Sequence, residues 1–285
     1  SLNSRFYWDA NENVLLYTTA SDIISAAADS NSYSVTKQTN DFGYPIVKAT
    51  SDSALIALDY VKQYSNITFK SYDDPARIVI TSKWDEIDSA TVSKSTQVRV
   101  KGGIKSPILK EVKKDDKITI LDSGDKWDKI ATEDGVIGYI KGKALSESKK
   151  TKLTNPDYEE ETFTHIKKDK DICLAWNQVT SQSANSKVPQ VISSTKGINV
   201  MSPTWFYLND NNGNLADIAS KDYVSYCHSQ GIEVWGLFSN FENTDVDAAY
   251  VLTHTSTRTT LINQIMSAAF NYELDGVNID FENIT

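Results

Sequence analysis

The sequence has few residues of the kinds that usually hold a chain together covalently or through a metal. Two cysteines in 285 residues are too few for a disulfide framework. We expect Cys173 to lie in a buried strand and Cys227 in a helix, both as small core residues. Three histidines are present, and their positions show no metal-ligand spacing. The sequence therefore predicts no metal site and calls for no cofactor.

The chain also lacks a basic excess and a long apolar run. Its formal net charge of -9 argues against nucleic acid as a partner, because a phosphate-binding surface needs an excess of lysine and arginine. No apolar stretch is long enough to predict a membrane span, and the first residues do not resemble a signal peptide. Ser1-Leu2-Asn3 resembles the start of a processed chain, from which a signal would already be gone.

What is present is an ordinary soluble composition, 40% hydrophobic and 24% charged, with room for two or three domains. Residues 1–88 predict a small α+β domain. Residues 91–146 predict a small all-β barrel of five short strands, separated by turn residues such as Gly102-Gly103 and Asp134-Gly135. A polar linker over 147–168 follows, and residues 169–285 form the last domain.

Two of these regions resemble known modules. Residues 91–146 resemble bacterial SH3 domains over their whole length, with Trp127 and Tyr139 where those domains keep aromatic residues. Such modules often bind cell-wall peptides, but the two aromatic residues can equally complete a tiny core. Residues 1–88 loosely resemble the stalk-like domains related to the copper amine oxidase N-terminal module, without copper ligands.

From residue 169 onward, apolar strands alternate with helices. Strands are predicted at 172–176, 197–202 and 232–238, helices at 216–230 and 257–272, and a fourth strand ends the chain. Trp176 and Trp235 lie inside strands, so we expect both in the core. This alternation predicts parallel βαβ units with right-handed crossovers, and the first half of a (β/α)8 TIM barrel.

The fourth strand carries the strongest functional signal. Because side chains alternate along a strand, Asn278, Asp280 and Glu282 share one face, and the apolar Val277, Ile279 and Phe281 share the other. We expect the apolar face to meet helices and the acidic face to collect chemistry at the C-terminal edge of the sheet. A solvated strand end or a metal site is the alternative.

The same segment resembles the signature of family 18 glycoside hydrolases, the chitinase-like enzymes, written D-G-x-x-x-D-x-E. Asp275, Gly276, Asp280 and Glu282 match it, and Asn278 replaces its usual middle Asp, as in the bacterial cell-wall and spore-cortex hydrolases. The resemblance implies that Glu282 protonates the leaving oxygen, while Asp280 orients the N-acetyl group that acts as nucleophile. A general acid near neutral pH needs a raised pKa, and Asp280 supplies a nearby like charge.

Further residues follow neighbouring strands. Trp205 is expected to stack on a sugar ring, or to pack in the core, and Asn240 to contact substrate together with Asn278. Around them, S-P-T-W-F at 202–206 and V-W-G-L at 234–237 also resemble the cell-wall subgroup. The S-x-G-G motif of typical chitinases is absent from the third strand, which makes a chitin substrate doubtful.

Only four of eight barrel strands are predicted, and the sequence stops three residues after Glu282. We expect this polypeptide by itself to be inactive, unless a reading frame that continues past Thr285 or a homodimer of paired half-barrels supplies the rest. Three functions remain open: hydrolysis of N-acetylglucosamine-containing glycan such as peptidoglycan, non-catalytic cell-wall binding through the SH3-like and stalk-like modules, and a purely structural role. The resemblance implies an extracellular or spore-associated location.

Overall fold

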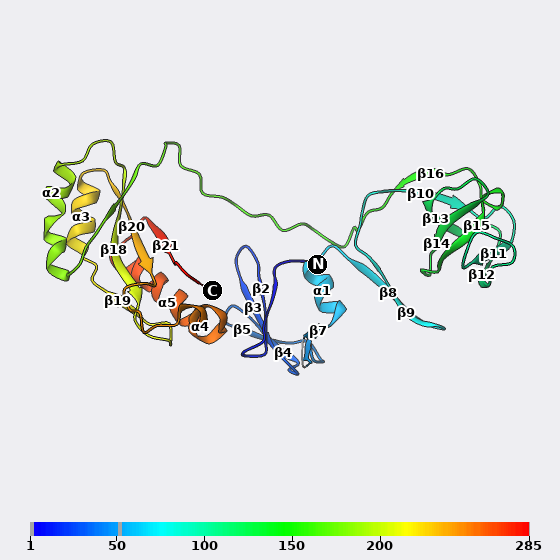
Figure 1. Ribbon diagram of the computed structural model, residues 1–285, viewed down its shortest axis with the longest axis horizontal. Coiled ribbons are helices and arrows are strands. Elements are labelled where there is room, and N and C mark those ends of the chain that lie inside the picture. Colours follow the sequence, from blue (N-terminus) through cyan, green and yellow to red (C-terminus); the bar gives the residue numbers. More distant parts are fainter. Residues whose placement is uncertain (1–2, 51–52, 285) are drawn as a thin grey trace. The chain divides into compact units, whose positions relative to one another are not determined.

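The computed structural model describes residues 3–50 and 53–284. The chain is mostly β-structure with a few helices, and its strands form several separate sheets (Figure 1). It divides into two compact units. One combines residues 1–5, 45–48 and 55–162, and the other combines 6–44, 49–54 and 163–285. The domain limits proposed from the sequence stay predictions.

The first unit contains a seven-stranded antiparallel sheet. Its strands follow the order β12-β11-β15-β14-β13-β10-β16. Their bounds are β10 Glu86–Thr91, β11 Thr96–Arg99, β12 Ile108–Val112, β13 Lys117–Asp122, β14 Trp127–Thr132, β15 Ile137–Lys141 and β16 Lys149–Lys152. Five short strands are predicted from the sequence, at 97–100, 108–112, 117–121, 127–131 and 137–140, and they match β11 to β15 within one residue at each end. The strands β10 and β16 are not predicted. Alternating apolar residues close a small core, made of Val92, Val98, Val112, Ile118, Ile130 and Ile140.

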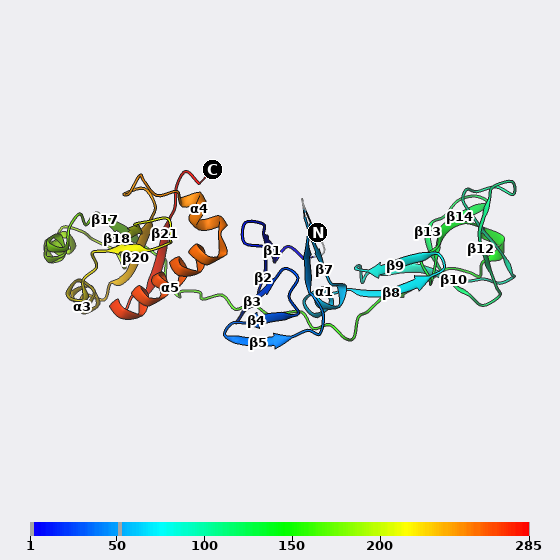
Figure 2. The same ribbon diagram turned by 90° about the horizontal axis from the view of Figure 1, so that it is seen from below.

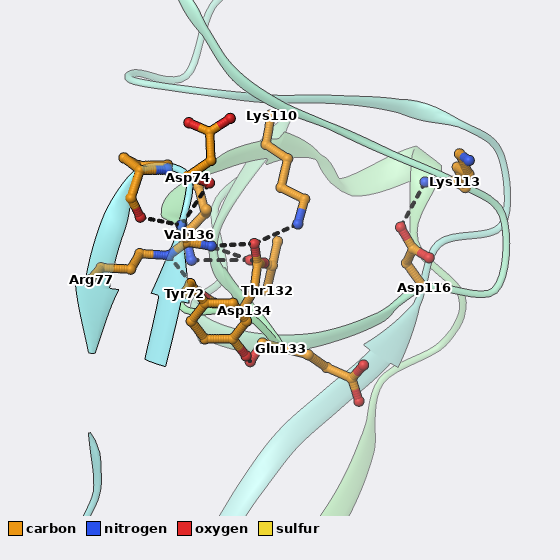
Figure 3. A network of polar contacts seen from close by, with 11 residues as sticks. Tyr72, Asp74, Arg77, Lys110, Lys113, Asp116, Thr132, Glu133, Asp134 and Val136 are labelled. Atoms are coloured by element: carbon orange, nitrogen blue, oxygen red, sulfur yellow. Dashed lines mark hydrogen bonds and ion pairs between the residues drawn. The ribbon is translucent and has the colours of Figure 1, made fainter. Parts of the chain in front are cut away.

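A hairpin of β8 (Thr68–Asp73) and β9 (Ala76–Thr81) is attached to the turn between β14 and β15. Arg77 donates to the Asp134 carboxylate at 2.6 Å, and Lys110 approaches the same oxygen at 2.6 Å (Figure 3). Burial opposes the charge on Asp134, but hydrogen bonds from Lys110 and Thr132 outweigh it and lower the pKa of that carboxyl. These contacts attach the hairpin to the seven-stranded sheet.

Three further short elements lie between residues 47 and 64. They are β6 (Val47–Ala49), β7 (Ala54–Ile56), which pairs with β6, and α1 (Leu58–Tyr64). Tyr60 and Val61 are the buried residues of α1, so the helix packs through its apolar face.

The second unit begins with an antiparallel meander in the order β1-β2-β3-β4-β5. The strands are β1 Phe6–Asp9, β2 Val14–Thr18, β3 Ile23–Ala27, β4 Ser32–Val35 and β5 Gln38–Asp41. Leu15, Tyr17, Ile24 and Ala26 are buried, because period-two alternation turns one face of these strands inward.

The rest of the second unit is a parallel sheet in the order β17-β18-β20-β21, with β19 paired antiparallel to β18. The strands are β17 Leu174–Asn177, β18 Val200–Leu208, β19 Leu215–Asp217, β20 Glu233–Ser239 and β21 Gly276–Asp280. Neighbours in sequence are neighbours in space, as the predicted βαβ units require.

Helices connect these strands. A 3-10 turn (Gln182–Lys187) and α2 (Val188–Ser193) follow β17, α3 (Lys221–Ser229) precedes β20, and α4 (Ala248–Thr253) and α5 (Thr255–Tyr272) precede β21. Figure 2 shows α3 and α5 on the same side of the strands. Their apolar residues meet that sheet face in one core, which includes Met201, Phe206, Tyr223, Cys227, Val234, Phe238 and Ala268. Within the described ranges, no helix is long and apolar enough to cross a membrane.

Three local expectations are wrong. Trp176 is 71% exposed, because it lies on the sheet face away from the helices and on an edge strand. Cys173 is exposed, just before β17 begins, whereas Cys227 is buried on α3 as expected. The helix predicted from Ala216 begins only at Lys221, after the Ser220 hydroxyl caps it, because Leu215–Asp217 pairs as β19.

Candidate functional site

The motif-bearing strand β21 lies at one edge of the parallel sheet, paired with β20. The register places Asn278 beside Leu237 and Asp280 beside Ser239. Asn278 and Asp280 therefore share the sheet face that the helices do not cover, and both side chains are half-buried. The predicted alternation is present, and it directs these two polar groups to the open face.

Glu282 lies two residues beyond the end of β21 and is exposed. Its backbone is held by one side chain, that of Asn240, which directly follows β20. The Glu282 amide donates to Asn240 Oδ1 at 2.8 Å, and Asn240 Nδ2 donates to the Glu282 carbonyl at 2.8 Å. Asn240 thus contacts the candidate acid itself, through both ends of its amide.

The polar groups on the open face are connected across strands. Asn278 Nδ2 donates to the Ser202 hydroxyl on β18 at 3.1 Å. The buried Ser239 hydroxyl lies 2.5 Å from Glu242 Oε2, and it also contacts the Phe206 carbonyl at 3.3 Å. Hydroxyls on β18 and β20 therefore orient the side chains of Asn278 and Glu242.

Asp275, the first residue of the D-G-x-x-x-D-x-E match, has a structural environment. Its Oδ2 accepts from the Val234 amide at 2.8 Å and lies 2.8 Å from His228 Nε2 on α3. The Asp275 amide donates in turn to the Val234 carbonyl. This carboxylate joins α3, β20 and β21 at the end of the sheet opposite to Glu282.

Gly276 follows Asp275 for a steric reason. A Cβ at this position would lie 2.8 Å from three atoms of the Trp235 ring. The half-buried Trp235 therefore requires glycine at the start of β21, and Asp275-Gly276 sets how β21 begins against β20.

Trp205 is 0% exposed, so its ring belongs to the core. Its Nε1 donates to Asn185 Oδ1 at 2.7 Å, and its ring packs edge-on against Tyr223. The indole has no face open to a sugar ring in this structure. Of the two interpretations drawn from the sequence, the geometry favours packing.

The apolar face of β21 is less covered than expected. Val277 and Ile279 are exposed, the latter at 52%, and β21 is an edge strand of the sheet. Phe281 is half-buried and packs against a small cluster around Leu208 and Leu261. The expectation that helices cover this face holds for Phe281 alone.

Glu242 is an acidic residue at this edge of the sheet that the sequence reasoning missed. A signal was available: Phe241-Glu242-Asn243, shortly after β20, repeats Phe281-Glu282-Asn283, which directly follows β21. This repeat aligns Gly236 with Gly276, but in the sheet Gly236 lies beside Val277, so the strands pair one residue away from the sequence alignment. Comparing the two strand ends would have indicated both carboxylates.

The arrangement can donate a proton from an exposed carboxyl and can stabilise a positive charge beside it, because Asp280 ends β21 and Glu282 and Glu242 follow two adjacent parallel strands. No group of three or more histidine, cysteine, aspartate or glutamate residues suited to a metal ion occurs in the described part of the chain. Away from this edge, burial raises the pKa of the Cys227 thiol to about 12.

No family model matches the sequence, and no curated protein matches it. Solved structures match part of the chain. The C-terminal domain of a protein assigned as a chitinase in Desulfitobacterium hafniense is 24% identical over 39% of this chain and 34% of its own, with a TM-score of 0.34. A Chromobacterium violaceum chitinase is 17% identical over 40% and 36%, with a TM-score of 0.32.

The spore cortex-lytic enzyme of Bacillus cereus is 15% identical over 47% of this chain and 33% of its own, with a TM-score of 0.34. The chain thus spans about a third of the length of these structures. The similarity is therefore partial.

Proposed function

We propose that this chain is a glycoside hydrolase, or part of one, that cleaves N-acetylglucosamine-containing cell-wall glycan such as peptidoglycan. Glu282 acts as the general acid and Asp280 as the group that orients the substrate's acetamido group. Asn278 contacts the same sugar. The protein works outside the cell or on the spore. The observation that carries the proposal is the placement of Asn278 and Asp280 on the open sheet face, with Glu282 held just beyond their strand.

The proposed reaction is retaining and substrate-assisted. The acetamido oxygen attacks the anomeric carbon while the glycosidic C–O bond breaks, and the bonding electrons stay with the leaving oxygen. Glu282 gives its proton to that oxygen. The Asp280 carboxylate stabilises the positive charge that develops on the cyclised acetamido group. Water then attacks the anomeric carbon, the ring opens to restore the acetamido group, and Glu282 takes the proton from water.

The deciding experiment measures turnover of purified peptidoglycan by the full natural chain and by Glu282→Gln. We expect the variant to lose about 10²- to 10⁴-fold in kcat, because the amide has the size of the acid but no proton to give. Asp280→Asn should also lose activity, and N-deacetylated glycan should not be cleaved. Unchanged turnover in Glu282→Gln would remove Glu282 as the acid.

A specific groove supports a second candidate function, non-catalytic wall binding. It has a volume of about 410 Å³ and lies on the seven-stranded antiparallel sheet. Trp127 and Ile104 are its apolar walls, and three lysines (126, 141 and 143) outnumber two aspartates (125 and 128) among its lining residues. Lys141 Nζ lies 5.7 Å from the centroid of the Trp127 ring. An aromatic wall beside amines suits a peptide that carries carboxylates.

Sedimentation with purified cell walls separates the two candidates. If binding is the function, Trp127→Ala should release the chain from the walls, and Glu282→Gln should have no effect on any measured property. Ile137→Ala, which removes an exposed apolar side chain of the same sheet outside the groove, is the matched control. Retention of Trp127→Ala on the walls would contradict the binding role of this groove.

A further inference from the structure

The hydrogen-bonded pairing of β20 and β21 ends before the candidate acid is reached. Its last pair is Ser239 with Asp280, so Glu282 has no strand partner of its own. The residue after Ser239 is Asn240, and its side chain makes the next two hydrogen bonds, one to the Glu282 amide and one to the Glu282 carbonyl, each 2.8 Å long. A side-chain amide here does what a backbone peptide does in the sheet.

We propose that Asn240 is the positioning residue of the acid: it fixes the backbone of Glu282, and through it the place from which the carboxyl donates its proton. This inference rests on the proposed function and changes the role expected for Asn240, from contact with substrate to contact with the acid. Both ends of the Asn240 amide are used for Glu282.

The geometry explains why the contact needs asparagine. The amide offers one acceptor and one donor at fixed spacing, which match the N–H and C=O of a single residue. Aspartate at this position would keep the acceptor but would set a negative oxygen against the Glu282 carbonyl. Glutamine would keep the chemistry on a longer side chain. Asn240 therefore differs from the other strand-end asparagine, Asn243, which donates to the Asn209 carbonyl instead.

The benefit of such a contact is positional. Glu282 is exposed and lies beyond the last pair of β20 and β21, so strand pairing does not fix its backbone. Displacement of a catalytic group by about 1 Å can cost around 10²-fold in rate. Two short hydrogen bonds from a residue anchored on β20 hold the acid in register with Asp280, which the strand pairing itself positions.

The first test is kinetic and uses the full natural chain. Asn240→Ala should lower kcat on an oligosaccharide by at least about tenfold, with KM within about twofold of the wild type. The loss should be much smaller on an aryl glycoside with an activated phenol as leaving group, because such a group needs little protonation. Asn263→Ala, which removes an exposed asparagine of α5, is the matched control.

Coupling to the acid is the second readout. In a double-mutant cycle, Asn240→Ala should add nothing to the loss in Glu282→Gln, because a misplaced group that cannot donate a proton loses nothing further. Additive losses, or an equal loss on both kinds of leaving group, would assign Asn240 to substrate binding or to folding and would overturn the inference.

The third readout needs no turnover. In the wild-type chain the Glu282 amide should be protected from hydrogen exchange, as measured by NMR, and Asn240→Ala should speed its exchange by roughly tenfold or more. Asn263→Ala should leave it unchanged. Exchange that stays as slow in Asn240→Ala would overturn the contact itself. Full activity in Glu282→Gln with fast exchange in Asn240→Ala would overturn the proposed function and keep the contact.

Discussion

The Trp205 indole and the Asn185 amide form a buried pair whose loss should separate packing from sugar binding. Trp205→Phe keeps an aromatic ring but removes the donor to Asn185 Oδ1, leaving a buried acceptor unpaired. We expect the free energy of unfolding to fall by about 1–3 kcal/mol in urea titration, with glycan binding unchanged. Trp176→Phe, at an exposed position, should stay within about 0.5 kcal/mol of the wild type. Loss of glycan binding in Trp205→Phe without loss of stability would return Trp205 to the site.

At the residue scale, the sequence predicts which residues share a face of a strand. It does not predict which residue of one strand pairs with which residue of the next. The shared face of Asn278 and Asp280 follows from period two alone. The contact between Asn240 and Glu282 joins residues 42 positions apart, and it depends on the register in which β20 pairs with β21. No local pattern fixes that offset, so Asn240 was expected to face substrate.

At the element scale, helix α5 begins with caps supplied by a distant hairpin. His254, its N-cap residue, provides no side-chain cap. Asp9, which is 1% exposed, accepts from the Thr255 amide at 2.7 Å and from the Thr255 hydroxyl at 2.6 Å. Glu12 accepts from the Ser256 amide at 2.9 Å. Carboxylates from the end of β1 and from the β1–β2 turn therefore satisfy two free amides of the helix that leads into β21.

This arrangement predicts a pH-dependent contribution of Asp9 to stability. Burial opposes the charge on Asp9, but hydrogen bonds from Thr255 and from the Asn11 and Glu12 amides outweigh it and lower its pKa. A lowered carboxyl pKa stabilises the fold above the unfolded value of about 3.9, and the stabilisation is lost as the pH falls through the folded value. Asp9→Asn should cost about 1–2 kcal/mol at pH 7.

Thermal unfolding across pH checks this prediction. The difference between wild type and Asp9→Asn should shrink as the solution is acidified through the range in which Asp9 titrates. Asp29→Asn, at an exposed position of the same meander, should differ little from wild type at any pH. A difference between wild type and Asp9→Asn that is constant with pH would contradict a role for the Asp9 charge.

Strands with alternating apolar residues could be predicted from the sequence. Strands that depend on pairing with a distant strand could not. In the seven-stranded sheet, alternation and turn residues predict five of the strands. β16 was missed because Lys149–Lys152 is wholly charged or polar and wholly exposed. Such an edge strand has no core face, and its lysines discourage pairing with other chains. Its existence depends on pairing with β10, which a local pattern does not show.

At the scale of the whole molecule, the parallel sheet leaves two edges and an apolar helix face open. β17 and β21 are the two edge strands. On α5, Ile262, Met266 and Phe270 recur at helical spacing and are all exposed, Phe270 at 77%. Val277 and Ile279 on β21, the strand that follows α5, are exposed as well. Monomers rarely leave a large apolar surface in water, so we expect these residues to be covered.

We expect a second copy to cover this surface, with β21 of one protomer beside β17 of its partner. A two-fold axis would repeat that junction and join the two sheets into eight parallel strands, the number that closes a β/α barrel. Light scattering at micromolar concentration should then give twice the mass of 31.7 kDa. Phe270→Lys should shift the protein toward monomer, because a charge would have to be buried at the interface. Ser267→Lys, at an exposed polar position of the same helix, is the matched control. A wild-type chain that stays monomeric at these concentrations would contradict the pairing and leave the open edges to another partner.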